Sequence, residues 1–236
     1  MINKIVSSAA AAVADVFDGA TVLISGFGEA GSPIELIHAL VDRGARELTI
    51  VSNNTGSGHV GLASLIEQGC VRKMICSFPK TANSVVFPAL YERGDIELEL
   101  VPQGTMAERI RCGGAGIPAF YTPTSVNTPL AEGKEHRDFD GVPHVLEHAI
   151  RADFALVKCR RADRYGNLVY NKTARNFGPV MCTAARVTVV QAGEVVDVGV
   201  IDPECVVTPG IFVQRVVHVA HPQDESTLVA EGRRYP

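Results

Sequence analysis

The stretch TVLISGFGEAGSP, residues 21–33, decides the fold class of this chain. Residues 21–24 are apolar or β-branched and predict a short buried strand. Pro33 opens the helical run 34–41, because proline is favoured at a helix's first position, where its missing N–H would be unpaired anyway. Between the two, residues 26–31 satisfy the pattern G-x-G-x-x-G. A strand, a glycine loop and a helix in this order offer an anion site, with backbone N–H groups and the helix dipole facing the ligand.

The same alternation of short strands and helices continues along the chain. Further helices are expected at about 3–17, 60–67 and 83–92, and further strands at 48–51, 72–76, 96–101, 155–158, 187–190 and 212–217. Strand 96–101 alternates apolar and charged residues, which suits an edge or half-exposed position. Strands that alternate with helices predict an α/β fold, with an open, mostly parallel sheet flanked by helices.

Two segments fall outside this alternation. Residues 111–135 are rich in Gly, Pro and Thr and predict a long loop, and such loops inside compact domains are more often functional than incidental. Residues 222–236 are polar and are expected to be frayed. We therefore predict one domain over residues 1–221, followed by a polar C-terminal tail over residues 222–236.

The composition is that of an ordinary globular protein. Of the 236 residues, 46% are hydrophobic and 20% are charged, and the net charge of −4 provides no basic field for nucleic acid or an anionic membrane. No apolar run approaches the roughly 18 residues that a membrane span needs. The six cysteines show no C-x-x-C pair and no zinc spacing, which predicts reduced, mostly buried thiols in a cytoplasmic protein.

The glycine pattern alone does not identify the ligand. A dinucleotide-binding unit needs an acidic residue at the end of its second strand, about 20 residues on, to hold the ribose hydroxyls. Here that strand ends in Ser52-Asn53-Asn54, and Glu47 stands at its beginning, away from the ligand crevice. The missing acidic residue disfavours NAD. An NAD site and a loop with no ligand role both stay open as alternatives to another anionic ligand.

Three amides follow predicted strands at points where a ligand would lie. Asn53 and Asn54 come after strand 48–51, and Gln103 comes after strand 96–101. Residues just past the carboxyl ends of parallel strands converge on one crevice. Uncharged amides there can donate hydrogen bonds to a carbonyl or an oxyanion without requiring a particular protonation state. For the two asparagines, simple turn formation is the alternative.

Other catalytic patterns are weak. Residues 144–148 match H-x-x-E-H, an inverted zinc-peptidase motif, but Pro143 precedes them and a strand-like run follows, which leaves little room for the helix that such a zinc site needs. We therefore expect two surface histidines there and no metal. No nucleophile–base pair stands out. Glu29 is a carboxylate inside the glycine loop, but no neighbour in the sequence marks it as a nucleophile.

The chain also contains several longer motifs: DGATVLISGFGEAGSP at 18–33, VSNN at 51–54, PQGTMAERIR at 102–111, GGAGIPAFYTPT at 113–124, ARNF at 174–177 and TPGIFV at 208–213. Together they resemble the coenzyme A transferases, and specifically the A (alpha) subunit of the 3-oxoacid CoA-transferases. The resemblance covers about residues 3–220, which is nearly the whole chain.

The resemblance implies a fold, a partner and a mechanism. The family fold is an open α/β sheet, and activity requires two homologous subunits, alpha and beta. The catalytic glutamate lies in the B (beta) subunit, within Ser-Glu-Asn-Gly, a tetrapeptide that this sequence does not contain. In the family mechanism, this carboxylate attacks the acyl-CoA thioester and gives an acyl anhydride and then a glutamyl-CoA thioester, from which a second carboxylic acid takes the CoA. These intermediates survive only where water is excluded, as under the roof of another subunit.

The resemblance also implies site residues. The loop that matches the family's CoA-associated glycine loop comprises Ser25, Gly26, Phe27, Gly28, Glu29, Ala30 and Gly31. Asn53, Asn54 and Gln103 match amides that line the family's acyl site and would support catalysis. Two departures stand out: Glu29 adds a charge where the family usually has a neutral residue, and residues 125–128 replace Gly-Tyr-Gly-Thr. Because the nucleophile belongs to the beta subunit, no catalytic residue is expected in this chain.

Substrate and assembly follow from the same resemblance. The runs at 176–181 and 208–217 look most like 3-oxoadipate:succinyl-CoA transferases of aromatic catabolism, with acetoacetate:succinyl-CoA transfer as the alternative. The expected ligands are coenzyme A, as an acyl-CoA substrate, and a 3-oxo acid, without metal or NAD. The expected partner is the beta subunit, in an αβ heterodimer or an α2β2 heterotetramer. Neither nucleic acid nor a membrane is an expected partner.

Overall fold

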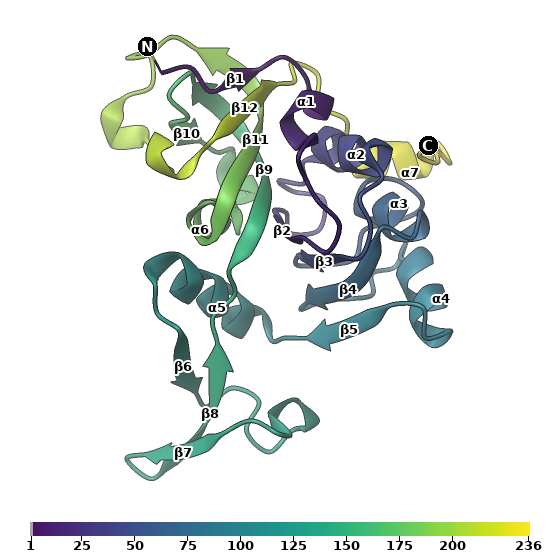
Figure 1. The fold of residues 1–236 in the computed structure, drawn as a ribbon, viewed down its shortest axis with the longest axis vertical. Helices are drawn as coiled ribbons and strands as arrows, with labels where there is room; N and C mark the ends of the chain where they lie inside the picture. Colours follow the sequence, from purple (N-terminus) through teal and green to yellow (C-terminus); the bar gives the residue numbers. More distant parts are fainter. Residues whose placement is uncertain (1) are drawn as a thin grey trace.

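A largely parallel sheet forms the centre of this computed structural model, which describes residues 2–236 (Figure 1). Its strands are β1 (Ile5–Val6), β2 (Thr21–Ile24), β3 (Leu48–Val51), β4 (Val71–Cys76), β5 (Glu97–Leu100), β9 (Ala152–Asp163), β10 (Leu168–Val169), β11 (Ala185–Val196) and β12 (Arg215–His218). The order is β1-β12-β11-β9-β2-β3-β4-β5, with all neighbours on this path parallel and β10 antiparallel beside β9. The predicted fold class is therefore confirmed, as is the edge position of the alternating strand β5.

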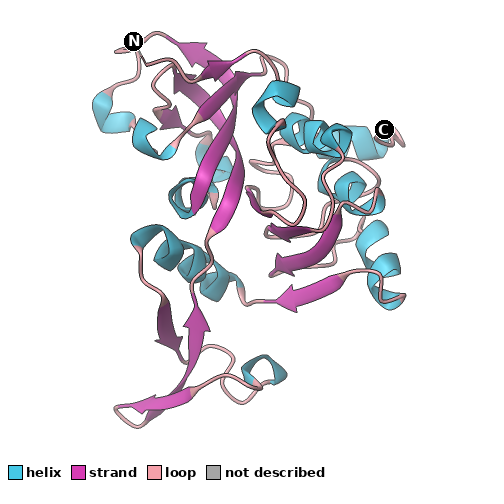
Figure 2. Cartoon of the chain, in the orientation of Figure 1, coloured by secondary structure: helices cyan, strands magenta, loops and turns pink. Residues whose placement is uncertain are grey.

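Helices cover both faces of this sheet (Figure 2). One face carries α1 (Ala9–Val13), α2 (Ile34–Arg43), α3 (Gly61–Glu67) and α4 (Val86–Glu92), and the other carries α5 (Gln103–Ala115) and α6 (Gly178–Ala184). Successive side chains of a strand point to opposite faces. In β2, Val22 and Ile24 accordingly pack with the first group of helices, and Leu23 packs with the second. Because both faces are covered, β2 is a continuous apolar run.

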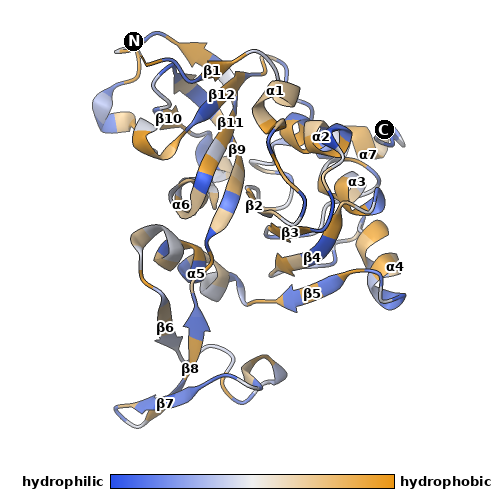
Figure 3. Ribbon diagram, in the orientation of Figure 1, coloured by the Kyte–Doolittle hydropathy of each residue, from blue (hydrophilic) through white to orange (hydrophobic). Residues whose placement is uncertain are grey.

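A small antiparallel arm projects from this body at the bottom of Figure 1. It consists of β6 (Ala119–Thr122), β7 (His136–Phe139) and β8 (Val142–His148), in the order β6-β8-β7. The chain enters the arm from α5 and returns from β8 into β9. Strand β7 is mostly hydrophilic in Figure 3, and all four of its residues are exposed.

The prediction of a helix over residues 3–17 is wrong. The segment begins with β1, in which Ile5 pairs with Val216 of β12, and only Ala9–Val13 are helical. Ser8 separates the two elements because its hydroxyl accepts a hydrogen bond from the Ala11 N–H and so caps the helix. A pairing partner near the other end of the chain therefore overrides the local helical pattern.

The prediction of a long loop over residues 111–135 is also wrong, because α5, β6 and a short 3-10 helix, η1 (Pro129–Ala131), occupy much of it. The glycines that suggested a loop are packing glycines inside α5. A Cβ on Gly113 would lie 1.9 Å from the carbonyl oxygen of Ile150, and one on Gly114 would lie 2.2 Å from Thr183 Oγ1. Helix α5 thus needs these glycines to approach α6 and the start of β9.

The expectation of a frayed C-terminus is wrong as well. Residues after His221 form α7 (Glu225–Ala230), and Tyr235, near the end of the chain, contacts α2. Tyr235 stacks on His38, with ring centroids 3.7 Å apart, and its hydroxyl donates to Asp42 at 2.7 Å. Polar residues of the tail therefore bond to the body of the protein instead of water. The division into a domain over 1–221 and a separate tail stays a prediction.

The H-x-x-E-H motif lies on strand β8, not on a helix. His144 and His148 are not buried, which fits the expected pair of surface histidines, whereas Glu147 points inward and is 2% exposed. Over residues 2–236, no group of three or more potential ligands is placed to hold a metal ion. Across the same residues, no helix combines the length and apolarity that crossing a membrane requires.

Candidate functional site

The candidate site lies at the carboxyl edge of the sheet, where β2, β3, β4 and β5 end. Asn53 follows β3 and is 3% exposed. Its side-chain amide donates to Ser77 Oγ, just past β4, at 3.1 Å, and to Gln103 Oε1, at the start of α5, at 3.2 Å. Asn54 donates from its own amide to the carbonyl oxygen of Gly28 at 3.3 Å. The structure thus brings together the three amides and the glycine loop that the sequence placed at this edge.

The glycine loop, residues 25–31, is a tight turn with its own hydrogen bonds. The Phe27 N–H donates to the carbonyl oxygen of Ala30 at 3.0 Å. The buried hydroxyl of Ser25 donates to the carbonyl oxygen of Gly31 at 2.7 Å. Gly31 has a φ of +84°, and a Cβ there would lie 2.4 Å from the carbonyl oxygen of Ala174. Only glycine satisfies both conditions without strain. The loop is therefore closely packed against the segment around Ala174.

Asn176 holds the loop from that segment, and the sequence patterns assigned it no role. Its Oδ1 accepts from the N–H of Gly26 at 3.3 Å, and its Nδ2 donates to the carbonyl oxygen of Ala30 at 2.7 Å. The signal was present, because Asn176 belongs to the ARNF motif at 174–177. Ser77, the second partner of Asn53, was also missed, although it follows a predicted strand as Asn53 does.

A cleft of about 590 Å³ opens beside the glycine loop. Glu29, Ala30 and Gly31 form one wall, and basic residues from β9 and the 171–174 segment contribute to the others: Lys158, Arg160 and Lys172. A neighbouring hollow of about 430 Å³ is lined by Phe27 and Ala30 together with Lys172 and Arg175. The first hollow also has the acidic residues Glu29, Glu194 and Asp224 on its walls, so its charge is mixed. The second has Lys172 and Arg175 and no acidic residue, which favours an anionic ligand.

Glu29 turns toward the C-terminal helix. Its carboxylate accepts a hydrogen bond from the N–H of Ser226 at 2.7 Å, in the first turn of α7. The neighbouring carboxyl of Glu225 is 6% exposed, and burial, with a further contribution from the charge of Glu29, raises its pKa to about 7. The Glu29 carboxylate of the glycine loop is therefore bonded to the backbone of α7 in the tail.

The buried thiols offer no nucleophile. Five of the six cysteines are buried, which confirms that part of the sequence prediction, and Cys205 is exposed. Burial raises the pKa of the Cys76 thiol and of the Cys182 thiol to about 12. Both thiols therefore stay protonated near neutral pH, and a protonated thiol is a poor nucleophile.

Comparison with known proteins gives one consistent family. The model of the family described as "Coenzyme A transferase" matches residues 6–219. The chain is 56% identical over 220 residues to the A subunit of the 3-oxoadipate CoA-transferase of Pseudomonas putida, with 93% of this chain and 95% of the relative covered. It is 47% identical over 215 residues to the A subunit of a probable succinyl-CoA:3-ketoacid coenzyme A transferase of Bacillus subtilis, with 91% and 90% covered.

A solved structure shares the fold. The acyl-CoA transferase of Escherichia coli O157:H7, in a thioester complex with CoA, superposes with a TM-score of 0.84 at 23% identity. The superposition covers 94% of this chain but 50% of the other, so this chain spans about half the length of that protein. At this identity the comparison supports the arrangement of strands and helices.

Proposed function

The chain belongs to the coenzyme A transferase family, and from this premise we propose that it is the alpha subunit of an enzyme that moves CoA from succinyl-CoA to 3-oxoadipate. The observation that carries the proposal is the 56% identity to the Pseudomonas putida protein over nearly the full length of both chains. The alternative acceptor is acetoacetate, which the 47% identity to a succinyl-CoA:3-ketoacid transferase keeps open. The higher identity favours 3-oxoadipate.

The proposed enzyme needs a second chain. The relatives are named as A subunits, and the matched E. coli protein is about twice as long as this chain. Because the chain lacks Ser-Glu-Asn-Gly, we place the nucleophilic glutamate on a beta subunit, in an αβ or α2β2 assembly. We expect the assembly in the cytoplasm. Coenzyme A enters as a substrate, and neither a metal nor NAD takes part in the proposed reaction.

The proposed reaction proceeds through an acyl anhydride and a glutamyl-CoA thioester. The partner's carboxylate attacks the thioester carbonyl carbon, and the CoA thiolate leaves as an acyl anhydride forms. The thiolate then attacks the glutamyl carbonyl of the anhydride, which gives a glutamyl-CoA thioester and releases the first acid. A second carboxylate takes the CoA by the reverse steps. Each attack places negative charge on a carbonyl oxygen, so a fixed donor at that oxygen accelerates the reaction.

In the proposed enzyme this donor is Gln103. Asn53 donates to Gln103 Oε1 and is itself held by Ser77, so the Gln103 amide is fixed with its NH2 group directed away from Asn53. The NH2 group can then donate to the oxyanion. The glycine loop, residues 25–31, which Asn54 and Asn176 hold in place, contacts the CoA portion of the substrate in this proposal.

Reconstitution tests the proposal. The chain purified alone should show no CoA transfer, and co-expression with a beta-type partner from the same genome should give transfer from succinyl-CoA to 3-oxoadipate. Incubation of the complex with succinyl-CoA, without acceptor, should add the mass of CoA minus water to the partner chain. Robust transfer by the lone chain, or NADH binding detected by fluorescence titration, would contradict the proposal. Preferred use of acetoacetate would establish the alternative.

A further inference from the structure

The first turn of α5 carries hydrogen-bond donors that the described part of the protein leaves without acceptors. An α-helix has no internal acceptors for its first N–H groups, and here these belong to Gln103, Gly104 and Thr105. The N-cap residue is Pro102, which has no side-chain acceptor, and no acidic residue lies in the first turn. This end of a thirteen-residue helix is therefore electropositive and uncapped.

Thr105 adds a second and independent feature. It is 4% exposed, yet among residues 2–236 its Oγ1 has no hydrogen-bond partner. A buried hydroxyl without a partner is costly, because it has lost its hydrogen bonds to water. Thr105 lines a hollow of about 400 Å³, together with Gly104 and with Phe120, Thr122 and Thr124 at the arm's first strand. A ligand in this hollow would supply the missing partner.

Gly104 gives a third indication. A Cβ built there meets nothing within 4 Å, and the residue is helical without a positive φ. Nothing in the fold thus requires glycine at this position, although glycine is a poor helix former. Its absence of a side chain leaves the backbone N–H groups of the first turn open to the hollow. Glu108 also lines the hollow, but its carboxylate is paired with Arg111, at 2.6 and 2.8 Å.

We propose that this hollow binds the second carboxylate of a dicarboxylate substrate, the one that does not exchange CoA. The inference rests on the proposed function, since both succinyl-CoA and 3-oxoadipate carry such a group. Gln103 is the link between the two ends of the substrate. Its side-chain amide bonds to Asn53, where the reacting carbonyl lies in the proposed mechanism, and its backbone N–H belongs to the first turn of α5. Gln103 and Thr105 both lie in the first turn of α5, so the proposed substrate runs past this turn from the Gln103 amide to the hollow.

The recognition is that of an anion by a helix N-terminus, strengthened by one buried hydroxyl. A monocarboxylic 3-oxo acid such as acetoacetate has no group to place there. A phosphate of CoA is a second possible source of an anion. A phosphate contact would serve every acyl-CoA equally, whereas a carboxylate contact would serve only substrates with a second carboxyl group.

The test uses the assembled alpha–beta enzyme with Thr105→Val, which keeps the shape of the side chain and removes its hydroxyl. For 3-oxoadipate as acceptor, kcat/KM should fall about tenfold, as expected for one lost hydrogen bond to a charged group. For acetoacetate it should fall by less than about threefold, because no charged group is lost there. Thr105→Ser should restore most of the activity toward 3-oxoadipate. Equal losses for both acceptors would indicate a CoA phosphate contact or a structural role and would overturn the inference, as would no loss for either.

Gly104→Ala is a matched variant that should weaken recognition of the second carboxylate without destabilising the protein. Alanine favours the helix, so the melting temperature should be equal to or above that of the wild type. Its methyl group should nevertheless lower kcat/KM for 3-oxoadipate more than for acetoacetate. A uniform loss for both acceptors, or none, contradicts the proposed site.

Equilibrium dialysis with labelled succinate separates this inference from the proposed function, because it requires no transfer. The wild-type assembly should bind succinate more tightly than Thr105→Val does, and propionate should not distinguish the two. If the wild type transfers CoA but succinate binds both proteins equally, the inference fails and the proposed function stands. If succinate binding shows the expected difference but no acid accepts CoA, the proposed function fails and the carboxylate site stands.

Discussion

At the scale of single residues, Asn53 joins the ends of neighbouring strands, because its side-chain amide donates to Ser77 Oγ, past β4, and to Gln103 Oε1, past β5. Because parallel strands end together, the positions of Asn53, Asn54 and Gln103 after their strands predicted that they would lie at one edge of the sheet, and their role in catalysis stays a prediction. Asn176 was not predictable in this way. It reaches the glycine loop from 150 residues further along the chain, and no periodic pattern in the sequence encodes that approach.

The Gln103 amide gives the first prediction. In the assembled enzyme, Gln103→Glu keeps the size of the side chain but replaces its donor with a negative charge. We expect kcat to fall about 100-fold or more with a small change in KM, because the lost interaction is made mainly in the transition state. Asn53→Ala, which frees Gln103 to reorient, should lower kcat about tenfold. Steady-state kinetics that show an unchanged kcat for Gln103→Glu would rule out its proposed role.

The closeness of the glycine loop to the chain at Ala174 gives the second prediction. Gly31→Ala should destabilise the protein by about 3 kcal/mol, because the new Cβ combines a positive φ with a clash against a backbone oxygen. Gly133→Ala is the matched control. Gly133 has a similar φ of +74°, but a Cβ there meets nothing within 4 Å, so we expect about 1 kcal/mol. Urea unfolding measures both, and equal values would mean that the loop relaxes away from Ala174.

At the scale of secondary-structure elements, local sequence patterns predicted the elements correctly where strands alternate with covering helices. They failed where a contact with a distant part of the chain determines the structure. Helix α5 is the clearest case. Gly113 and Gly114 lower helix propensity, and they are present because α6 and the chain at Ile150 come too close for any side chain. The sequence shows the glycines but not the neighbours that require them. For β1, likewise, the deciding partner is β12, near the other end of the chain.

The tail element α7 gives a prediction on pH dependence. The pKa of Glu225 is raised to about 7 in the docked tail, chiefly by burial, from an ordinary value of 4.5. The docked state therefore binds this proton more tightly than the undocked state. Its contribution to docking is complete below a pH of about 4.5 and is lost as the pH rises through about 7, a loss of up to about 3 kcal/mol. The tail should thus loosen progressively between about pH 4.5 and about pH 7.

Hydrogen exchange of the α7 amides, followed across this pH range and corrected for the intrinsic rate, measures the effect. Glu225→Gln is neutral at every pH and should keep the tail protected at the alkaline end of the range. The Glu29 carboxylate lies near Glu225 and accepts a hydrogen bond from the Ser226 N–H. Glu29→Gln should therefore weaken the N-terminal turn of α7 without abolishing the pH dependence. If wild type and Glu225→Gln show the same pH profile, Glu225 is not the titrating group.

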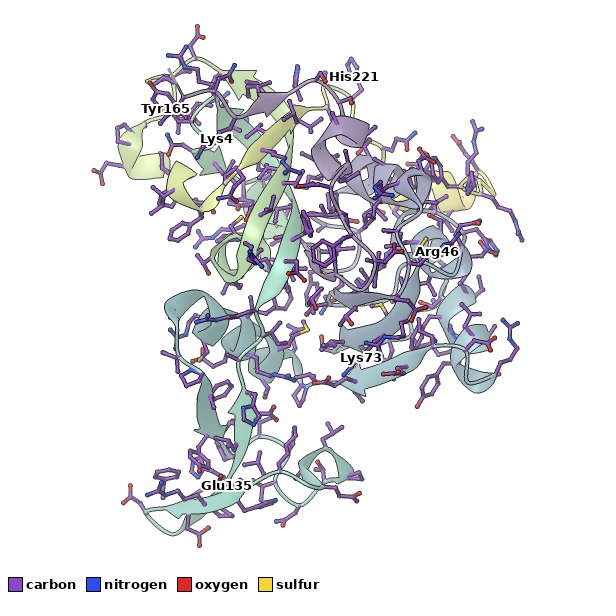
Figure 4. The ribbon with its side chains drawn as sticks, in the orientation of Figure 1. Lys4, Arg46, Lys73, Glu135, Tyr165 and His221 are labelled. Carbon is purple, nitrogen blue, oxygen red and sulfur yellow. The ribbon has the colours of Figure 1, made fainter. Side chains whose placement is uncertain are left out.

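At the scale of the whole molecule, the layered sheet followed from sequence patterns, but the arm and the docked tail did not. The arm has a mostly polar strand, β7, and a second strand whose buried positions include a carboxylate, so its pattern resembles that of a loop. What distinguishes it is a chain of charges that reaches the main sheet. Lys73 of β4 and the arm, marked by Glu135, lie well apart in Figure 4. Ion pairs connect them: Lys73 pairs with Glu99, Glu99 with Arg109, and Arg109 with Glu147 of the arm.

This charge network gives the last prediction. Glu147 is 2% exposed, accepts a hydrogen bond from Lys134 at 2.5 Å and lies 3.9 Å from Arg109, which in turn pairs with Glu99 at 2.7 Å. Removing one member of a buried pair leaves the opposite charges without compensation. Glu147→Ala should therefore destabilise the protein by about 3 kcal/mol.

The loss should be local to the arm. Hydrogen exchange should show reduced protection of β6 and β8, while β2 and β3 of the main sheet keep theirs, because the central sheet has its own apolar core on both faces. Glu132→Gln is the control on the same arm. Glu132 is exposed and no ion pair to it is present among residues 2–236, so its substitution should change stability by no more than about 0.5 kcal/mol. If Glu147→Ala loosens the main sheet and the arm equally, the arm is part of one cooperative unit with the body.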